Sequence, residues 1–215
     1  MIGDAEKTSR PRRRGRPREE HFLEREHELL ESALELFLHQ GYRGTTITQI
    51  MSAAHVSKRT LYQHYPDKAA LFKAALEYGI AELAISRETL AAVESDDLEQ
   101  SLQRIAAILV RNLMTATGIR LITITNSAAY SVPEIAEYAY RKGSEEINSF
   151  ISELLRRHVP GCSREKAERA ARAFQTLVIG GLARMRAWGV EYDDASIERL
   201  TLLRARLFVK GILKV

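Results

Sequence analysis

The sequence predicts an all-α fold, in which a small N-terminal helix-turn-helix domain precedes a larger helical domain. Apolar residues recur at spacings of three and four along most of the chain, as on one face of an α-helix. Nowhere do apolar and polar residues alternate between turn signals as they would in strands, and no internal repeat is evident. We expect a disordered arm over residues 1–20, the helix-turn-helix domain over 21–68 and the larger domain over 69–215.

The first 20 residues are polar and strongly basic. Between Lys7 and Arg18 there are seven Lys or Arg residues and no acid. So few apolar side chains cannot offset the entropy lost on ordering, and this composition therefore predicts a disordered arm.

Capping signals divide the following stretch into short helices. A helix is expected from about His21, with Gly41 as its stop, because apolar residues share one face (Phe22, Leu29, Leu30, Ala33, Leu34, Leu36 and Phe37). Thr45 and Thr46 offer N-caps for a helix to about Ala54, and Ser57 offers one for a helix over residues 58–64. Asp67 is the expected cap of a longer helix that continues to about residue 92.

The remaining segments are also helical in period. Helices are predicted over residues 98–114, 119–130, 133–158, 163–188 and 194–213, separated by Pro160-Gly161, by Gly189 and by shorter breaks. These segments form the larger domain.

Residues 45–65 have the pattern of a helix-turn-helix, in which the second helix enters the DNA major groove. Leu61 is expected to point into the core, which leaves the opposite face for DNA: Lys58, Arg59, Thr60, Tyr62 and Gln63. Arg59 suits a guanine edge and Gln63 an adenine edge.

This region closely resembles the DNA-binding domain of TetR/AcrR-type transcriptional regulators. The resemblance rests on Gly41-Tyr42, Thr45-Thr46-Ile47, Ile50, Val56-Ser57, Thr60-Leu61-Tyr62, Tyr65 and residues 68–71. It implies a homodimer that binds double-stranded DNA, and a larger domain that binds a small-molecule effector and forms the dimer interface. Most such proteins are repressors that an inducer releases from a palindromic operator. The turn position that usually holds Gly is His55 here, and a non-Gly residue with positive φ is strained.

The resemblance also adds DNA contacts outside the face of the second helix. It places Thr60 and Tyr62 near the DNA backbone or thymine methyl groups, and His64 and Lys68 near phosphates. Lys68 also stands beside a helix N-terminus, which attracts anions. Thr45 and Thr46 are candidate phosphate donors, and Thr46 is equally suited to be a helix cap.

The basic arm contains a second DNA-binding candidate. The stretch from Arg13 to Arg18 has a Gly-Arg-Pro core that resembles an AT-hook, a segment that lays arginines such as Arg14 and Arg16 in a narrow minor groove. The alternative is a basic tail that attracts DNA without sequence preference.

Two apolar stripes near the C-terminus suggest a dimer interface, which the resemblance favours. The first stripe contains Ala170, Ala171, Phe174, Leu177, Val178, Gly181, Leu182, Met185 and Trp188, and the second Ile197, Leu200, Leu203, Leu207, Phe208 and Ile212. Gly180-Gly181 within a helix suggests that another helix approaches closely. The alternative is that both stripes face only the subunit's own core.

The effector pocket is expected among apolar and amphipathic residues of the larger domain. The candidates are Met114, Arg120, Ile122, Asn126, Tyr130, Tyr138, Phe150 and Phe174, with Arg120 as a partner for an anion. The alternative for each of these residues is a plain core position.

Composition and motifs exclude several classes of protein. The single cysteine, Cys162, cannot form an intrachain disulfide, no apolar run approaches the roughly 20 residues of a membrane span, and no signal peptide is recognisable, so a cytoplasmic protein is expected. No metal, cofactor or catalytic motif is present, so neither a cofactor nor an enzyme is expected. The alternative to an effector-responsive regulator is an architectural or regulatory DNA-binding protein without a small-molecule ligand.

Overall fold

The computed structural model describes residues 18–212, which form helices and connecting loops without a strand. The first helix already begins at Arg18, three residues before His21, where a helix is expected to begin. Among these described helices, no single one is long and apolar enough to cross a membrane. Only one pair, Leu98–Leu113 with Ala116–Ala128, reaches that length and composition, and it is bent by 76°.

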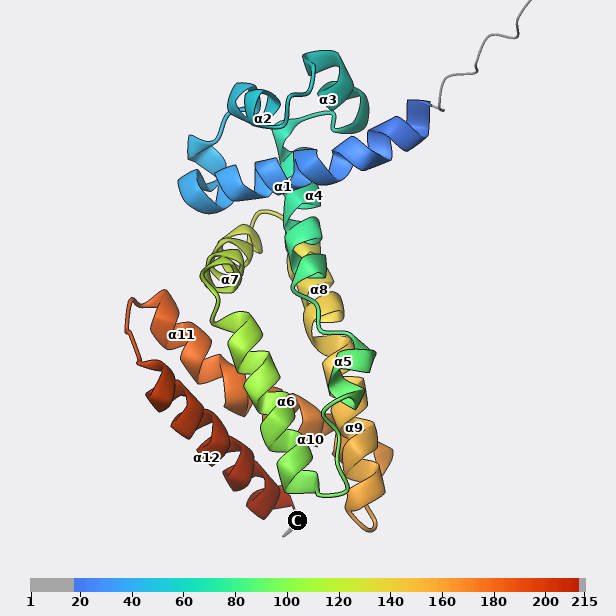
Figure 1. The fold of residues 1–215 in the computed structure, drawn as a ribbon, viewed down its shortest axis with the longest axis vertical. Coiled ribbons are helices and arrows are strands. Elements are labelled where there is room, and N and C mark those ends of the chain that lie inside the picture. Colours follow the sequence, from blue (N-terminus) through green and yellow to red (C-terminus); the bar gives the residue numbers. More distant parts are fainter. Residues whose placement is uncertain (1–17, 213–215) are drawn as a thin grey trace, which may run out of the picture.

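Four helices form the N-terminal part: α1 (Arg18–Gly44), α2 (Ile47–Ala53), α3 (Lys58–His64) and α4 (Lys68–Glu82). In Figure 1, α2 and α3 lie on the side of α1 that faces away from the C-terminal helices, and α4 runs from this end into the rest of the molecule. Gly41 has a φ of 70° and breaks the helical geometry within α1, which agrees with the helix stop predicted at this glycine.

Eight further α-helices and two π-helical segments follow. They are α5 (Arg87–Ala91), α6 (Leu98–Leu113), α7 (Ala116–Ala128), α8 (Pro133–Tyr140), η1 (Arg141–Glu145), α9 (Glu146–His158), α10 (Arg164–Gln175), η2 (Thr176–Gly180), α11 (Gly181–Ala187) and α12 (Asp194–Ile212). The expected helices over 133–158 and 163–188 are thus continuous, each with a wider π turn inside.

The buried side chains form two clusters, and the boundary between them does not follow residue 68. The N-terminal cluster includes Leu29, Phe37 and Leu61, continues along α4 to Ile80, and takes in Leu121, Ala128 and Ile135 from α7 and α8. The C-terminal cluster is formed by α6, α9, α10, η2 and α12, with Leu90 of α5 and Leu182 of α11. The helices α4, α7 and α8 therefore join the helix-turn-helix to the larger domain.

The expectation that the helix after Asp67 continues to residue 92 is wrong. Helix α4 ends at Glu82, and Ser86 caps the separate helix α5, its Oγ accepting from the Thr89 backbone N–H at 3.3 Å. The Leu83 carbonyl accepts a hydrogen bond of 2.6 Å from Asn112 Nδ2 on α6. A residue 29 positions away therefore satisfies a carbonyl that the helix end leaves free.

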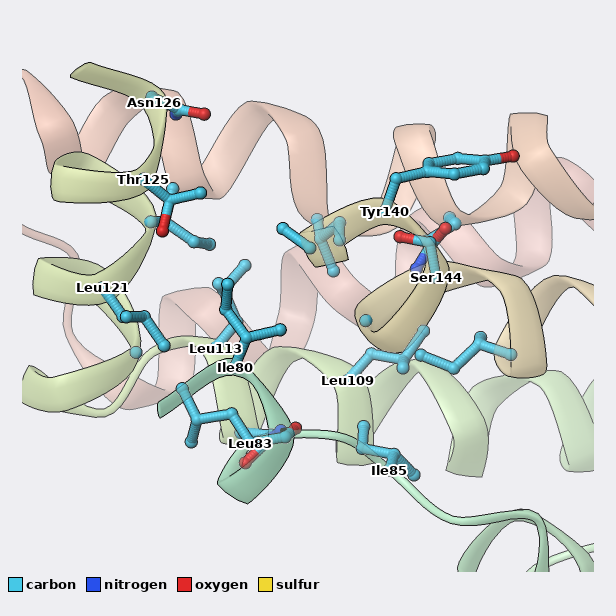
Figure 2. A pocket seen from close by; sticks show the side chains of 18 residues that line it. Ile80, Leu83, Ile85, Leu109, Leu113, Leu121, Thr125, Asn126, Tyr140 and Ser144 are labelled. Atoms are coloured by element: carbon cyan, nitrogen blue, oxygen red, sulfur yellow. Dashed lines mark hydrogen bonds between the residues drawn. The ribbon is translucent and has the colours of Figure 1, made fainter. Parts of the chain in front are cut away.

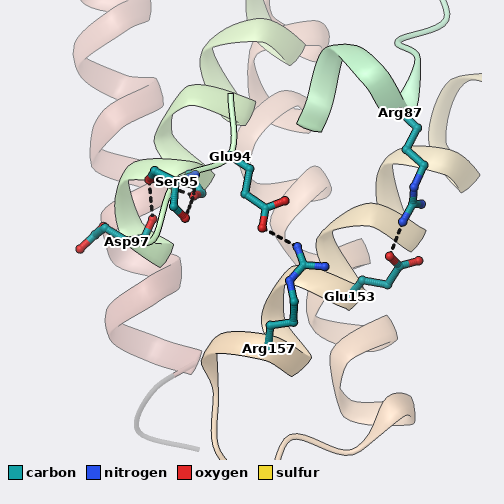
Figure 3. Close-up of polar contacts among 7 residues, drawn as sticks. Arg87, Glu94, Ser95, Asp97, Glu153 and Arg157 are labelled. Atoms are coloured by element: carbon teal, nitrogen blue, oxygen red, sulfur yellow. Dashed lines mark hydrogen bonds and ion pairs between the residues drawn. The ribbon is translucent and has the colours of Figure 1, made fainter. Parts of the chain in front are cut away.

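Ion pairs hold α5 and the following loop against α9 (Figure 3). Arg87 pairs with Glu153 and also with Glu146, the latter at 3.2 Å, and Arg157 pairs with Glu94 at 2.6 Å. These side chains are largely solvated, so the pairs add little stability and mainly set how α5 lies on α9.

Candidate nucleic-acid interface and ligand pocket

Helix α3 presents a polar face at the end of the molecule (Figure 1). The Ser57 Oγ accepts a hydrogen bond of 3.1 Å from the Thr60 backbone N–H, which caps the helix. Leu61 is fully buried, so the opposite face points outward. On that face Lys58, Arg59, Tyr62 and Gln63 are exposed, and Thr60 is half-buried. The structure thus brings the five α3 residues singled out in the sequence onto one accessible surface.

The turn between α2 and α3 has the strained geometry expected of it. His55 has a φ of 53°, and it is the one non-glycine residue with positive φ in the described part of the chain. The next residue, Val56, donates its N–H to the Met51 carbonyl at 3.1 Å. His55 therefore takes the left-handed conformation that usually requires glycine.

A hydrogen bond from Tyr65 connects the end of α3 to α1. The Tyr65 hydroxyl donates this hydrogen bond of 2.7 Å to Glu26 Oε1, across 39 residues of sequence. Burial, followed by the neighbouring Glu26 carboxylate, raises the pKa of Tyr65 far above its usual value. The phenol is a donor at physiological pH, and its hydrogen bond to Glu26 links the end of α3 to α1.

Lys68 lies against an aromatic residue, Tyr42, that the sequence offers as part of the family resemblance but not as a DNA contact. The Lys68 ammonium lies 4.5 Å from the centroid of the Tyr42 ring. Tyr42 is itself partly exposed, and its place directly after the helix-breaking Gly41 was the available signal. His64, the other expected phosphate contact, is exposed on α3. Tyr42 thus joins Lys68 at the edge of the candidate DNA surface.

The two adjacent threonines have different positions. Thr46 is exposed and caps α2, with its Oγ1 accepting from the Gln49 backbone N–H at 3.2 Å. Thr45 is fully buried, and its hydroxyl lies 2.9 Å from the Gly41 carbonyl and 3.1 Å from that of Leu36. Because this hydroxyl is already used inside the domain, Thr45 is not retained as a phosphate donor. Arg14 and Arg16 lie outside the described residues.

A cavity of about 290 Å³ lies between α4, α6, α7, η1 and the junction of α10 with η2 (Figure 2). Its wall is mostly aliphatic, with a few amides and hydroxyls. It is lined by Ile80, Leu83, Ile85, Leu109, Asn112, Leu113, Gly118, Leu121, Ile122, Thr125, Asn126, Ala139, Tyr140, Gly143, Ser144, Ile147, Gln175 and Ile179. Such a wall is typical of small-molecule sites.

Of the eight residues expected at the pocket, Ile122 and Asn126 line this cavity. Phe150 and Phe174 are buried in the C-terminal cluster, against which Met114 also packs. Tyr138 packs against the N-terminal cluster, Tyr130 is 96% exposed, and Arg120 is exposed beside His39 at 3.1 Å. These six are core or surface residues and are not retained.

Two buried polar residues of the wall were missed. Thr125 is one residue before Asn126, and Gln175 follows the core residue Phe174. A polar residue at a core-facing helix position was the available signal in both cases. Two π-helical segments border the cavity, since Gln175 directly precedes η2, and Gly143 and Ser144 of the wall belong to η1. π-helical turns often occur at functional sites.

The apolar stripes of the last helices divide between two environments. Most of their residues pack in the subunit's own core, but Leu177, Trp188, Leu203 and Leu207 are 40–68% exposed. At Gly181, an added Cβ would lie 3.0 Å from Arg204 Nη2, so the guanidinium end of a long α12 side chain, and not the α12 backbone, comes close there. The Arg204 Nη1 donates to the Val178 carbonyl in η2 at 3.0 Å.

Comparison with protein families agrees with this architecture. Residues 29–75 match the model of bacterial regulatory proteins of the TetR family. Residues 100–209, just over half of the chain, match the model of the C-terminal domain of AefR-like transcriptional repressors. The chain belongs to the TetR family.

Curated relatives of this TetR-family chain are helix-turn-helix transcriptional regulators. Rv1556 of Mycobacterium tuberculosis is 28% identical over 117 residues, which cover 54% of this chain and 55% of Rv1556, so the chain spans about half the length of that relative. YvkB of Bacillus subtilis is 24% identical over 86% of this chain and 95% of its own length.

Solved structures share the fold of this TetR-family chain. A TetR-family transcriptional regulator from Mesorhizobium loti has a TM-score of 0.76 at 21% identity, covering 88% of this chain and 96% of its own. The flavonoid-responsive regulator FrrA has a TM-score of 0.64 at 23% identity, covering 87% and 96%. At these identities the comparison establishes the fold.

Proposed function

We propose that the chain is a homodimeric repressor that binds a pseudo-palindromic DNA operator and leaves it when a small molecule occupies the larger domain. The observation that carries this proposal is the exposed polar face of α3, supported on Leu61 and Tyr65 at the end of the molecule. In a dimer, two such helices about 34 Å apart would enter successive major grooves. Arg59 and Gln63 read bases, while Thr46, Tyr42 and Lys68 contact the backbone.

The position of the cavity supports release by a small molecule. The cavity borders α4, the helix that connects the helix-turn-helix to the larger domain. Ile80 and Leu83, at the end of α4, line the cavity. Leu121 lines it from α7 and also belongs to the N-terminal cluster. A ligand that prefers one placement of α4 and α7 by a few kcal/mol changes the spacing of the two α3 helices and hence operator occupancy.

DNA binding is tested by Arg59→Ala. The purified protein is first used to select fragments of DNA from its source organism, and the enriched site is then titrated. We expect the substitution to cost about 1–3 kcal/mol of binding free energy and to relax base preference at one position in each half-site.

Arg111→Ala, an exposed change on α6, serves as the matched control and should leave the titration unchanged. Unchanged base preference after Arg59→Ala would contradict direct readout by Arg59. Recovery of DNA without an enriched site would favour the architectural alternative over an operator-specific repressor.

A further inference from the structure

The wall of the cavity contains no ionisable acid or base of the Asp, Glu, His, Lys or Arg type among the described residues that line it. We propose that the effector is an uncharged, mostly apolar molecule with two separate polar groups, one recognised by the Thr125 hydroxyl and the other by the Gln175 amide. This inference rests on the proposed function, because it specifies the ligand of the effector pocket.

Both polar side chains are largely buried, and neither makes a hydrogen bond within the described part of the chain. Thr125 is 7% exposed, and its Oγ1 makes no hydrogen bond. Gln175 is 8% exposed and lines the cavity, and its amide makes no hydrogen bond within residues 18–212 but, unlike the Thr125 hydroxyl, is not fully buried. A buried polar group without a partner costs free energy, so most such groups are satisfied. A ligand with a polar group beside Thr125 would remove that cost, and a second polar group would pair with the free Gln175 amide.

Asn112, in the same wall, differs from Thr125 and Gln175 because its amide has a structural hydrogen bond. Its Nδ2 donates to the Leu83 carbonyl at 2.6 Å and thereby closes the end of α4. The side chains of Thr125 and Gln175 make no such hydrogen bond within the described residues. They come from different helices, α7 and α10. Their separation selects a ligand with polar groups at two points of an apolar frame. In Figure 2, Thr125 lies on α7 between Asn126 and Leu121.

The lack of charge in the wall excludes anionic and cationic effectors of the same shape. A charged group that enters an apolar cavity loses its hydration and needs a counter-ion or several hydrogen bonds in return. Arg120, the anion partner expected from the sequence, is exposed and does not line the cavity. The volume of about 290 Å³ is at the lower end of ligand pockets and suits a compact molecule.

A matched pair of probes tests the charge preference. Methyl 6-hydroxy-2-naphthoate is uncharged at pH 7 and has a hydroxyl and an ester carbonyl at opposite ends of an apolar ring system. Its parent, 6-hydroxy-2-naphthoate, has almost the same shape and carries a carboxylate. Calorimetric titration of the full chain should show saturable binding of the ester and at least about tenfold weaker binding of the acid.

Substitutions then test the two recognition residues. Thr125→Val and Gln175→Leu should each weaken ester binding about three- to tenfold, as expected for one lost hydrogen bond. Thr123→Val, an exposed change on the same helix, and Gln100→Leu, an exposed change on α6, are the controls and should bind the ester as the natural chain does. Ile122→Trp, which fills the cavity, should abolish binding, and thermal melting confirms that each variant is folded.

Three results would overturn the inference. These are absence of ester binding, acid binding as tight as ester binding, or ester affinity that both Thr125→Val and Gln175→Leu leave unchanged. A separate titration of operator DNA distinguishes this failure from failure of the proposed function. If the ester binds as described and saturating ester leaves the protein on DNA, the ligand class stands and the coupling of pocket to DNA binding fails.

Discussion

At the scale of single residues, the turn of the helix-turn-helix has a strained position. His55 is exposed with a φ of 53°, a conformation that costs a residue with a side chain about 1–2 kcal/mol relative to the right-handed region. Glycine adopts it without this strain but loses more entropy on folding. We therefore expect His55→Gly to raise the free energy of unfolding by about 1 kcal/mol, measured by urea denaturation.

A glycine placed one turn earlier provides the control for this prediction. Ser52 is exposed within α2, where glycine is less favourable than most residues. Ser52→Gly should therefore lower the free energy of unfolding by a few tenths of a kcal/mol. A loss of stability in His55→Gly as well would mean that the imidazole makes a compensating contact in the folded protein.

At the scale of elements, the crossing of α1, α4 and α7 depends on Gly79. A Cβ at this position would lie 2.7 Å from Leu34 Cδ2 and 3.4 Å from Leu121 Cδ1, and both leucines are buried. Overpacking of this kind costs about 1–3 kcal/mol, whereas alanine gains at most about 1 kcal/mol in helix propensity. We expect Gly79→Ala to lower the free energy of unfolding by about 1 kcal/mol in chemical denaturation.

Two further variants separate the effect of the contact with Leu34 on the free energy of unfolding from the effect of helix propensity. Gly143→Ala adds a Cβ that meets nothing within 4 Å and should be neutral or stabilising. In a Leu34→Ala background, where the contacted methyl groups are gone, Gly79→Ala should become stabilising. If its effect has the same sign and size in both backgrounds, steric conflict with Leu34 is not the cause.

At the scale of the whole molecule, exposed leucines remain where the family resemblance places the dimer interface. Leu203 and Leu207 are 51% and 55% exposed and share one face of α12, because they are four residues apart. An exposed apolar patch of this kind often marks a protein interface. The double substitution Leu203→Glu and Leu207→Glu should give a monomer in sedimentation experiments. Operator affinity should fall with it, because a single subunit reaches one half-site.

The matched control is Tyr130→Glu, which places the same charge on a 96% exposed residue of the α7–α8 loop. This variant should sediment as the natural chain does. A double leucine variant that stays dimeric would show that the subunits associate through another surface.

Across these scales, local chemistry was predicted well from the sequence. The caps Thr46, Ser57 and Asp67 each accept a hydrogen bond from a backbone N–H three residues later, so their effect is contained in a few neighbouring residues. The stop at Gly41 and the strain at His55 are equally local. Such features do not depend on how the chain packs.

Long-range packing was not predictable in the same way. The break after α4 depends on Asn112, and the burial of Thr45 depends on the carbonyls of Leu36 and Gly41. Tyr130 fits the expected pocket by residue type, yet it projects into solvent beyond the end of α7. Periodicity tells which residues share a helix face but not which neighbour that face meets.

The sequence by itself determined most of the helices, their caps and the outward-facing side of α3, because these depend on interactions between residues three or four positions apart. Only the tertiary structure decided where the cavity lies and which polar groups it contains. Thr125 and Gln175 are 50 residues apart in the chain and line one wall only after α7 and α10 have packed. A cavity is the space that distant side chains leave unfilled, and its position therefore depends on the whole fold.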